Sequence, residues 1–268
     1  MHIVDLLNVE EIKDGLKTKW LGQKIYFYEE VDSTNEVAKR EAYKGTDDGS
    51  LFVTEQQSCG KGRLGRGWIT FPGAGVWMSL LLKPDMLPNK ISQITLIGGF
   101  VVCKAIRGYT GLDAYIKWPN DIVINGKKIC GILTEMSTDT EKINYIIHGI
   151  GINVNIDFFP EEIAHIATSL YIEGGKNYSR KALLQEILCH FEAYYEQFLK
   201  YGSLENIISE YEQLCINIGK EIQAISGNHI LYGKAVGITD SGELLIQKET
   251  GEVIKLNSGE VSLRGLSL

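Results

Sequence analysis

The sequence predicts an α+β fold, in which a large domain of strands and helices is followed by a small C-terminal β-barrel. Two observations lead to this prediction. Up to about residue 215, segments with apolar residues at helical spacing are interspersed with β-branched, apolar runs. After that point the chain changes to short alternating strands, with turns at Ser-Gly, Asp-Ser-Gly and Thr-Gly. We therefore expect a large domain over residues 1–215 and a small β domain over residues 216–268.

The first half of the chain alternates strand and helix signals. A strand is expected over Lys24–Tyr28, and a helix follows that ends near Gly45. Ser33 and Glu36 form an S-x-x-E capping box at the start of that helix. The next expected elements are strands over 51–55 and 75–82 and a helix in SQITLIGGFVVCKAIRGYTG, which has helical apolar spacing.

Three β-rich segments and two helices complete the large domain. The β-rich segments are AYIKWPNDIVIN, KKICGILTEM and INYIIHGIGINVNI. The dipeptide Asn125-Gly126 links the first two as a hairpin, because both residues accept the left-handed conformation that tight hairpin turns need. Between Ser179 and about Asn217 we expect two helices, broken near Gly202.

Composition excludes several classes of protein. The formal net charge of -7 argues against broad binding to nucleic acid or anionic membranes, which needs a basic face. The five cysteines are odd in number and form no C-x-x-C pair, so neither a disulfide framework nor a zinc site is expected. No uninterrupted apolar stretch reaches the length of a membrane span, and the N-terminus lacks the features of a signal peptide. These features fit a soluble protein of the reducing cytoplasm.

The stretch SCGKGRLGRGW, residues 58–68, has the glycine spacing G-x-G-x-x-G at Gly60, Gly62 and Gly65. In dinucleotide-binding folds this loop follows a strand, and the helix after it receives the pyrophosphate. The strand is present here, but the residues after the loop include Pro72 and three more glycines before a β-rich run. No helix is expected there, so we exclude a dinucleotide-binding fold.

Three cations, Lys61, Arg63 and Arg66, stand among these glycines. Glycine lets the backbone approach a ligand closely, and the cations supply fixed positive charge. A flexible, solvated basic loop is the alternative, but three cations within six residues are unexpected for such a loop on an acidic protein. We expect the loop to hold an anionic ligand with several oxygens.

The segment KWPND, residues 117–121, sets a cation, an aromatic ring, an amide and a carboxylate around a proline. A turn at a strand end explains Trp118 and Pro119 alone. It does not explain why Lys117, Asn120 and Asp121 occur together. This grouping favours a functional role.

Two weaker signals complete the set. The segment GIGINVN places Asn153 and Asn155 on one strand face, because residues two apart project together, although asparagines at strand ends often only make turns. DSTN, residues 32–35, is explained by a helix cap. With the cations and one carboxylate able to bind Mg²⁺, these amides favour phosphate chemistry of the adenylation type, without a Walker loop or kinase motifs.

In this order and spacing, DSTN, EQQSCGKGRLGRGW, GVWMSLLLKP, KWPNDIVINGKKICGILTEM and GIGINVN resemble the catalytic domain of biotin protein ligases. The similarity runs from about Lys24 to Asn155, and the tail ending GEVSLRG resembles the family's small SH3-like domain. It implies the mixed-sheet fold that biotin ligases share with class II aminoacyl-tRNA synthetases. The glycine-rich segment is then the loop that closes over biotin and its adenylate. Lys61 stands where the family commonly has arginine, which keeps the charge but loses the bidentate fork.

The resemblance implies a function with biotin and ATP as substrates and with Mg²⁺. Biotin is activated to biotinyl-5'-AMP and is then transferred to a lysine of a biotin carboxyl carrier protein. The carboxylate of biotin must attack a phosphate of like charge, so cations that neutralise the transition state lower the barrier.

Individual residues acquire roles from the same resemblance. The residues expected to bind biotin are Ser33, Thr34, Asn35, Gln57, Lys61, Gly62, Arg63, Lys128 and Gly131. Those expected to serve the nucleotide are Arg66, Trp68, Asn120 and Asn153. Those expected to act in catalysis are Arg63, Lys117, Asp121 and Lys128, with Asp121 also the candidate Mg²⁺ contact.

Two alternatives stand beside this interpretation. Lipoate- or octanoate-protein ligases share the fold and the acyl chemistry, but the full GKGRLGR with KWPND and GIGINVN favours biotin. Many family members carry an N-terminal winged helix that binds DNA, whereas here only 32 residues precede Ser33. We expect a monofunctional cytoplasmic ligase that binds neither DNA nor membrane, and the sequence leaves monomer and homodimer open.

Overall fold

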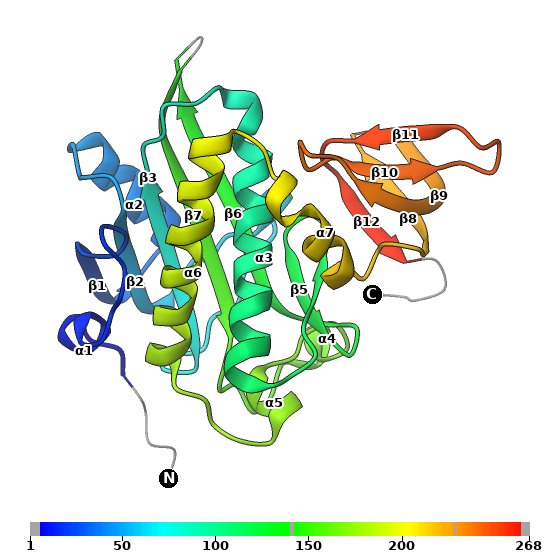
Figure 1. Cartoon of the computed structure of the whole chain (residues 1–268). Helices are drawn as coiled ribbons and strands as arrows, with labels where there is room; N and C mark the ends of the chain where they lie inside the picture. The colour runs from blue at the N-terminus through cyan, green and yellow to red at the C-terminus, as the bar shows by residue number, and fades with distance from the viewer. Residues whose placement is uncertain (1–5, 140–141, 228, 264–268) are drawn as a thin grey trace.

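The computed structural model describes residues 6–139, 142–227 and 229–263 (Figure 1). A seven-stranded mixed sheet forms the centre of the molecule, in the order β1-β2-β3-β7-β6-β5-β4. Strands β1 and β2 are parallel, and the other neighbours are antiparallel. The strands are β1 Ile25–Val31, β2 Ser50–Gln57, β3 Gly75–Leu82, β4 Tyr115–Lys117, β5 Asp121–Ile124, β6 Lys127–Thr138 and β7 Ile143–Asn153.

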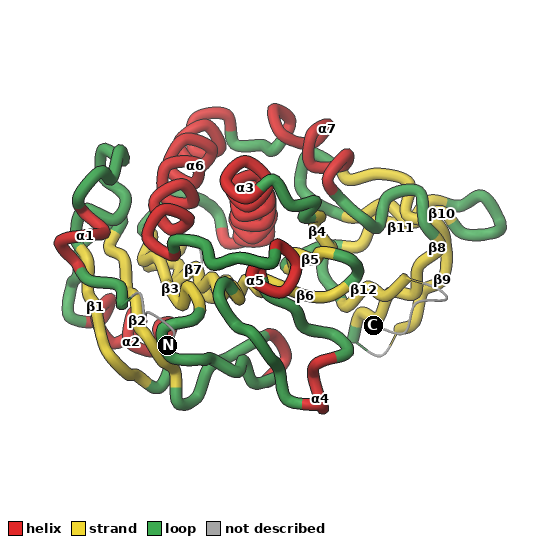
Figure 2. The backbone as a smooth tube through the Cα atoms, turned by 90° about the horizontal axis from the view of Figure 1, so that it is seen from below, coloured by secondary structure: helices red, strands yellow, loops and turns green. Residues whose placement is uncertain are grey.

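Helices cover the two faces of this sheet unequally. The long helices α3 (Ile91–Thr110) and α6 (Arg180–Tyr201) pack side by side on one face, and α2 (Thr34–Tyr43) lies on the other (Figure 2). The larger apolar core fills the space under α3 and α6, whereas α2 covers a small separate cluster around Phe52 and Leu81. The remaining helical segments are α1 Val9–Lys13, α4 Glu161–Ala164, α5 Leu170–Gly174, α7 Glu205–Leu214 and the 3₁₀ turns η1 Arg63–Gly65 and η2 Pro88–Lys90.

One helix has dimensions that the sequence analysis did not anticipate. The segment Pro88–Thr110, which contains α3, is long and apolar enough to cross a membrane by length and composition. However, 67% of its apolar window is buried inside the protein, where α3 packs against α6 and the sheet. Its apolar character is therefore that of a core helix.

A second sheet follows the last helix. Its strands are β8 Glu221–Ser226, β9 His229–Ile238, β10 Leu244–Gln247, β11 Val253–Leu256 and β12 Glu260–Leu263. They are antiparallel throughout, in the order β11-β10-β9-β8-β12. The predicted α+β class, with a C-terminal antiparallel domain, is thus confirmed. The end of the GEVSLRG motif, residues 264–265, lies outside the described residues.

Several local predictions are also confirmed. Asn125 and Gly126 form the hairpin turn between β5 and β6 with φ values of 51° and 79°, both in the left-handed region. The break between α6 and α7 falls at Gly202, which ends α6 in a left-handed conformation with φ 71°.

Two local predictions are wrong in detail. Ser33 is the N-cap residue of α2, but its side chain makes no capping hydrogen bond, so the expected capping box does not form. Glu36 instead pairs with Lys39 and Lys61. Strand β7 ends at Asn153, so Asn155 lies beyond the strand and does not share a strand face with it.

Candidate active site

One cavity lies where α2, the loop after β2 and the strands β6 and β7 meet. All nine residues that the sequence analysis assigned to biotin line this cavity. They are Ser33, Thr34, Asn35, Gln57, Lys61, Gly62, Arg63, Lys128 and Gly131. Residues that are far apart in the chain, such as Ser33 and Gly131, which are 98 residues apart, therefore meet in one place.

Glycines on β6 and β7 make room for the cavity. A Cβ atom at Gly149 would lie 2.2 Å from Oδ1 of Asn35, and one at Gly151 would lie 2.8 Å from Nε1 of Trp68. A Cβ atom at Gly131 would lie 2.9 Å from the Trp68 ring. Real Cβ atoms do not approach other atoms this closely, so the fit requires glycine. The sequence analysis found only Gly131, although the two-residue spacing of Gly149 and Gly151 indicates a shared strand face.

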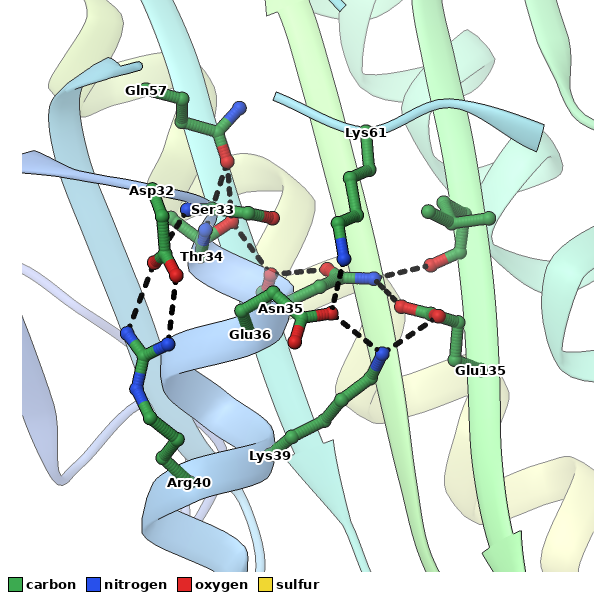
Figure 3. A network of polar contacts seen from close by, with 12 residues as sticks. Asp32, Ser33, Thr34, Asn35, Glu36, Lys39, Arg40, Gln57, Lys61 and Glu135 are labelled. Atoms are coloured by element: carbon green, nitrogen blue, oxygen red, sulfur yellow. Dashed lines mark hydrogen bonds and ion pairs between the residues drawn. The ribbon is translucent and has the colours of Figure 1, made fainter. Parts of the chain in front are cut away.

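Hydrogen bonds fix the polar wall of the cavity (Figure 3). The backbone N–H of Thr34 donates to Oε1 of Gln57 at 2.8 Å. The hydroxyl of Ser79 lies 2.7 Å from Oγ1 of Thr34 and 2.6 Å from Oδ1 of Asn35. Sequence analysis missed Ser79, whose only signal is a single hydroxyl within the apolar strand GVWMSLLL. Asp32 supports the same turn, because its carboxylate receives two hydrogen bonds from Arg40, at 2.8 and 3.0 Å.

The glycine-rich loop folds back on itself as a tight turn. The N–H of Gly62 donates to the carbonyl of Arg66 at 2.7 Å, and the N–H of Trp68 donates to the carbonyl of Gly60 at 2.8 Å. Leu64 at the tip has φ 58° and an exposed side chain. Two backbone hydrogen bonds between its flanks therefore hold the turn.

The three cations of the loop take different partners. Nη1 of Arg63 donates to Oδ1 of Asn120 at 2.6 Å. Arg66 pairs with Glu260 of the C-terminal sheet at 2.5 Å. Lys61 pairs with Glu36 of α2 at 2.8 Å. The loop is therefore tied to three separate elements.

The residues expected in catalysis gather around Asp121. Nζ of Lys128 lies 2.7 Å from Oδ1 of Asp121, and Nδ2 of Asn120 donates to the same oxygen at 3.0 Å. Lys117 is the register partner of Asp121 in the β4–β5 pair. Burial lowers the pKa of Lys117, while the charge of Asp121 opposes that shift. The cations Arg63, Arg66, Lys117 and Lys128 thus outnumber the two carboxylates that act on them, Asp121 and Glu260, as binding of an anion requires.

Trp68 covers this end of the cavity. Nζ of Lys128 lies 5.3 Å from the centre of the Trp68 ring, in cation–π contact. The indole Nε1 is buried and has no hydrogen-bond partner within the described part of the chain. A buried donor without a partner costs free energy, so this position of the ring is not stabilised by a hydrogen bond from the indole.

Two residues assigned to the nucleotide lie away from the cavity lining. Arg66 is exposed and pairs with Glu260. Asn153 is buried, and its Nδ2 donates to the carbonyl of Thr168 at 3.0 Å. Asn155 similarly holds the backbone of Tyr178 through two hydrogen bonds of 2.9 Å. Both asparagines therefore fix the loops that follow β7.

Residues 6–139, 142–227 and 229–263 contain no group of three or more His, Cys, Asp or Glu side chains that could hold a metal by themselves. Mg²⁺ in nucleotide sites is commonly held by one or two carboxylates together with substrate phosphates. Asp121 offers one such carboxylate beside the cations. This donor set fits a magnesium ion that arrives with a nucleotide.

Comparisons with known proteins cover both parts of the chain. The sequence model of the biotin/lipoate A/B protein ligase family matches residues 27–153, and that of the biotin protein ligase C terminal domain matches residues 218–264. The bifunctional ligase/repressor BirA of Bacillus subtilis is 39% identical over 259 residues, which cover 96% of this chain and 79% of that protein. A biotin--[acetyl-CoA-carboxylase] ligase of Mycobacterium tuberculosis is 27% identical over 87% of this chain and 86% of its own length.

A solved structure agrees with these sequence matches. The biotin protein ligase of Aquifex aeolicus, in complex with biotin and ATP, superposes with a TM-score of 0.79 at 33% identity. The superposition covers 90% of this chain and 99% of the other. Nearly the whole of that protein and most of this chain are therefore superposed.

Proposed function

The chain belongs to the biotin/lipoate A/B protein ligase family, and from this premise we propose that it is a biotin protein ligase. It activates biotin with ATP to biotinyl-5'-AMP and transfers biotin to a lysine of a biotin carboxyl carrier protein. The observation that carries the proposal is the single cavity lined by all nine residues assigned to biotin, with cations at one end. The relatives named for biotin ligation support it.

The polar wall of the cavity suits the ring system of biotin. Its ureido group offers two N–H donors and one carbonyl acceptor, and Ser33, Thr34 and Gln57 supply hydroxyl and amide groups in the lining. The glycine floor leaves room for the bicyclic ring system, and Trp68 supplies an apolar surface beside it. Specific binding thus comes from a few placed polar groups within a tight pocket.

The first half-reaction joins two anions. A carboxylate oxygen of biotin attacks the α-phosphate of ATP, the new C–O–P linkage forms, and pyrophosphate leaves. Arg63, Lys117 and Lys128 neutralise the negative charge that accumulates as the groups approach. Asp121 holds Lys128 in place and is positioned to contact Mg²⁺, which neutralises phosphate charge when it is bound.

The second half-reaction needs mainly positioning. The neutral amine of the acceptor lysine attacks the carbonyl carbon of the mixed anhydride, an amide forms and AMP leaves with the bond's electron pair. Asn120 and Trp68, which line the cavity, and Arg66 at the loop are proposed for the nucleotide half. Asn153 would serve it indirectly, by fixing the backbone of Thr168.

The partners and location follow from the same proposal. The acceptor is the lysine-bearing domain of a carrier protein, and the ligase works in the cytoplasm as a soluble enzyme. We also propose that this chain does not bind DNA sequence-specifically, which agrees with its net charge of -7. A gel-shift assay with a random-sequence duplex pool tests that point, and a discrete salt-resistant complex would contradict it.

Exchange of radiolabelled pyrophosphate into ATP tests the main proposal. The purified protein with Mg²⁺-ATP should support exchange with biotin and not with lipoate or octanoate. Lipoate or octanoate ligation is the alternative function of this fold. Exchange with either of these acids and none with biotin would replace the proposed function by that alternative.

A further inference from the structure

A continuous chain of polar contacts joins the glycine-rich loop to the wall of the cavity (Figure 3). Nζ of Lys61 lies 2.8 Å from Oε1 of Glu36, and Nζ of Lys39 lies 2.8 Å from the same oxygen. Lys39 also lies 2.8 Å from Oε1 of Glu135 on β6. Oε2 of Glu135 accepts a 2.8 Å hydrogen bond from Nδ2 of Asn35, which lines the cavity.

The local sequence explains how these groups meet. Glu36 and Lys39 are three residues apart on α2, so their side chains project from the same helix face. Asn35 and Glu36 are adjacent, so α2 presents one to the cavity and the other to the loop. Two carboxylates alternate with two ammonium groups, and the network has no net charge. Its two lysines lower the pKa of Glu36, so the carboxylate stays ionised at neutral pH.

A single ion pair on a protein surface contributes little to stability. Glu36 differs in two respects. Its side chain is only 27% exposed, and one of its oxygens receives two ammonium groups. Among the described residues, Glu36 is the ion-pair partner of Lys61, whose own side chain is 45% exposed. Without the Glu36 carboxylate, no ion pair within the described part of the chain would hold the Lys61 ammonium.

We propose that Glu36 is a positioning residue that holds the glycine-rich loop over the cavity through Lys61. Lys39 and Glu135 hold Glu36 and Asn35 in one arrangement, so the loop and the cavity wall are ordered together. For the loop itself, this proposal stands on the contacts alone. For ligand retention it rests on the proposed function, because the loop then covers biotin and its adenylate.

Trypsin cleavage of the ligand-free protein tests the closure of the loop. The loop contains three trypsin sites, Lys61, Arg63 and Arg66. Glu36→Gln keeps the size of the side chain and removes its charge, and we expect cleavage in the loop to be about three- to fivefold faster. The matched control is Glu41→Gln on the same helix, whose carboxylate pairs with Lys44 at 2.7 Å outside the network.

The control variant should be cleaved at the wild-type rate. If Glu36→Gln is cleaved no faster than Glu41→Gln, the proposal is overturned, whatever ligand the protein binds. Lys61→Gln provides a second variant, which should expose Arg63 and Arg66 to the same extent as Glu36→Gln. The midpoint of thermal unfolding of each variant should lie close to that of wild type. This result separates opening of the loop from a general loss of structure.

A double-mutant cycle on biotin binding tests the pairing. Glu36→Gln should raise the KM for biotin about three- to fivefold with little change in kcat, because it loosens a cover and leaves the reacting groups in place. Lys61→Gln also removes a residue of the cavity lining, so it should raise this KM at least as much. The double variant should have a KM for biotin no higher than that of the single variant with the higher KM. Additive losses would overturn the assignment of Glu36 to Lys61. A wild-type protein that does not bind biotin would contradict the proposed function, while the trypsin comparison would still decide on the loop.

Discussion

Nη1 of Arg63 donates a hydrogen bond of 2.6 Å to the side-chain oxygen of Asn120. Its Nη2 donates a second one, of 3.2 Å, to the carbonyl of Gly259. One side chain therefore connects the glycine-rich loop, the turn before β5 and the C-terminal sheet. Asn120 in turn donates to Asp121, which pairs with Lys128. The side-chain amide of Asn120 therefore links the Arg63 guanidinium to this ion pair.

Replacement of Arg63 by alanine should release the activated intermediate. A charge-assisted contact to the adenylate contributes about 1.5 to 3 kcal/mol, so its loss should weaken retention of biotinyl-AMP roughly tenfold or more. The escaped anhydride should then label lysines of bystander proteins such as serum albumin. Biotin transfer to albumin, compared with transfer to the carrier protein, measures this effect.

The same variant should keep its fold, because the Arg63 side chain makes polar contacts and supports no apolar core. Arg107→Ala is a suitable control, since Arg107 also donates to a backbone carbonyl, that of Ala114, away from the cavity. The control should label the carrier alone. If Arg63→Ala unfolds many degrees below wild type, or retains the adenylate as well as wild type does, then Arg63 supports the structure and does not hold the ligand.

Gly149→Ala should weaken biotin binding with a smaller effect on folding. The added Cβ would lie 2.2 Å from Oδ1 of Asn35, so Asn35 must move away from its hydrogen bonds to Ser79 and Glu135. Biotin affinity should fall by at least tenfold, which corresponds to about 1.4 kcal/mol. Isothermal titration with biotin, in the absence of ATP, measures this change directly.

Gly108→Ala provides the matched control for that substitution. Gly108 lies in α3, and a Cβ atom there would meet no atom within 4 Å among the described residues. Alanine in a helix is favoured over glycine by about 0.5 to 1 kcal/mol, so this variant should be slightly more stable and bind biotin normally. Equal losses of biotin affinity in both variants would show that the position of the methyl group does not matter.

The sequence predicted those features that depend on local chemistry. The left-handed turn at Asn125-Gly126 and the helix end at Gly202 each rest on one or two adjacent residues. The wall residues Thr34 and Gln57 were found because they belong to motifs of a known family. Such motifs carry the geometry of the site along with the residue types.

Contacts between distant segments could not be predicted in this way. Ser79 joins Thr34 and Asn35 across 44 or 45 residues, and no rule for a single strand gives that contact. Glu260, which pairs with Arg66, belongs to the other sheet. The capping-box prediction for Glu36 was wrong because two ammonium groups, one of them from the loop, compete for its carboxylate.

Arg180→Met should destabilise the protein strongly without altering the site. Arg180 and Glu55 form a buried ion pair at 2.7 Å, and the guanidinium also donates to the carbonyl of Gly75 at 3.1 Å. Removal of one partner leaves a buried charge, which costs about 3 to 5 kcal/mol. Urea unfolding measures the loss. The double variant with Glu55→Met should recover part of the lost free energy of unfolding. If the losses of the two single variants simply add in the double variant, the pairing is contradicted.

His148 should make the protein less stable in mild acid. The ring is fully buried, its Nδ1 lies 2.9 Å from Oγ1 of Thr134, and the Phe191 ring lies 5.0 Å away. Its Nε2 has no hydrogen-bond partner among the described residues. Burial lowers the pKa of His148 from 6.5 to about 3, because the charged ring would lose its solvation.

The direction of the pH effect follows from proton binding. Between pH 6.5 and about 3, the unfolded chain carries a proton on His148 and the folded protein does not. The free energy of unfolding should therefore be constant above pH 6.5 and decrease below it, by about 2 kcal/mol between pH 7.5 and pH 5. Urea unfolding across this range measures the slope. His148→Gln should remove it, whereas His229→Gln, at an exposed position on β9, should retain it. A slope that persists in His148→Gln would assign the acid sensitivity to other groups.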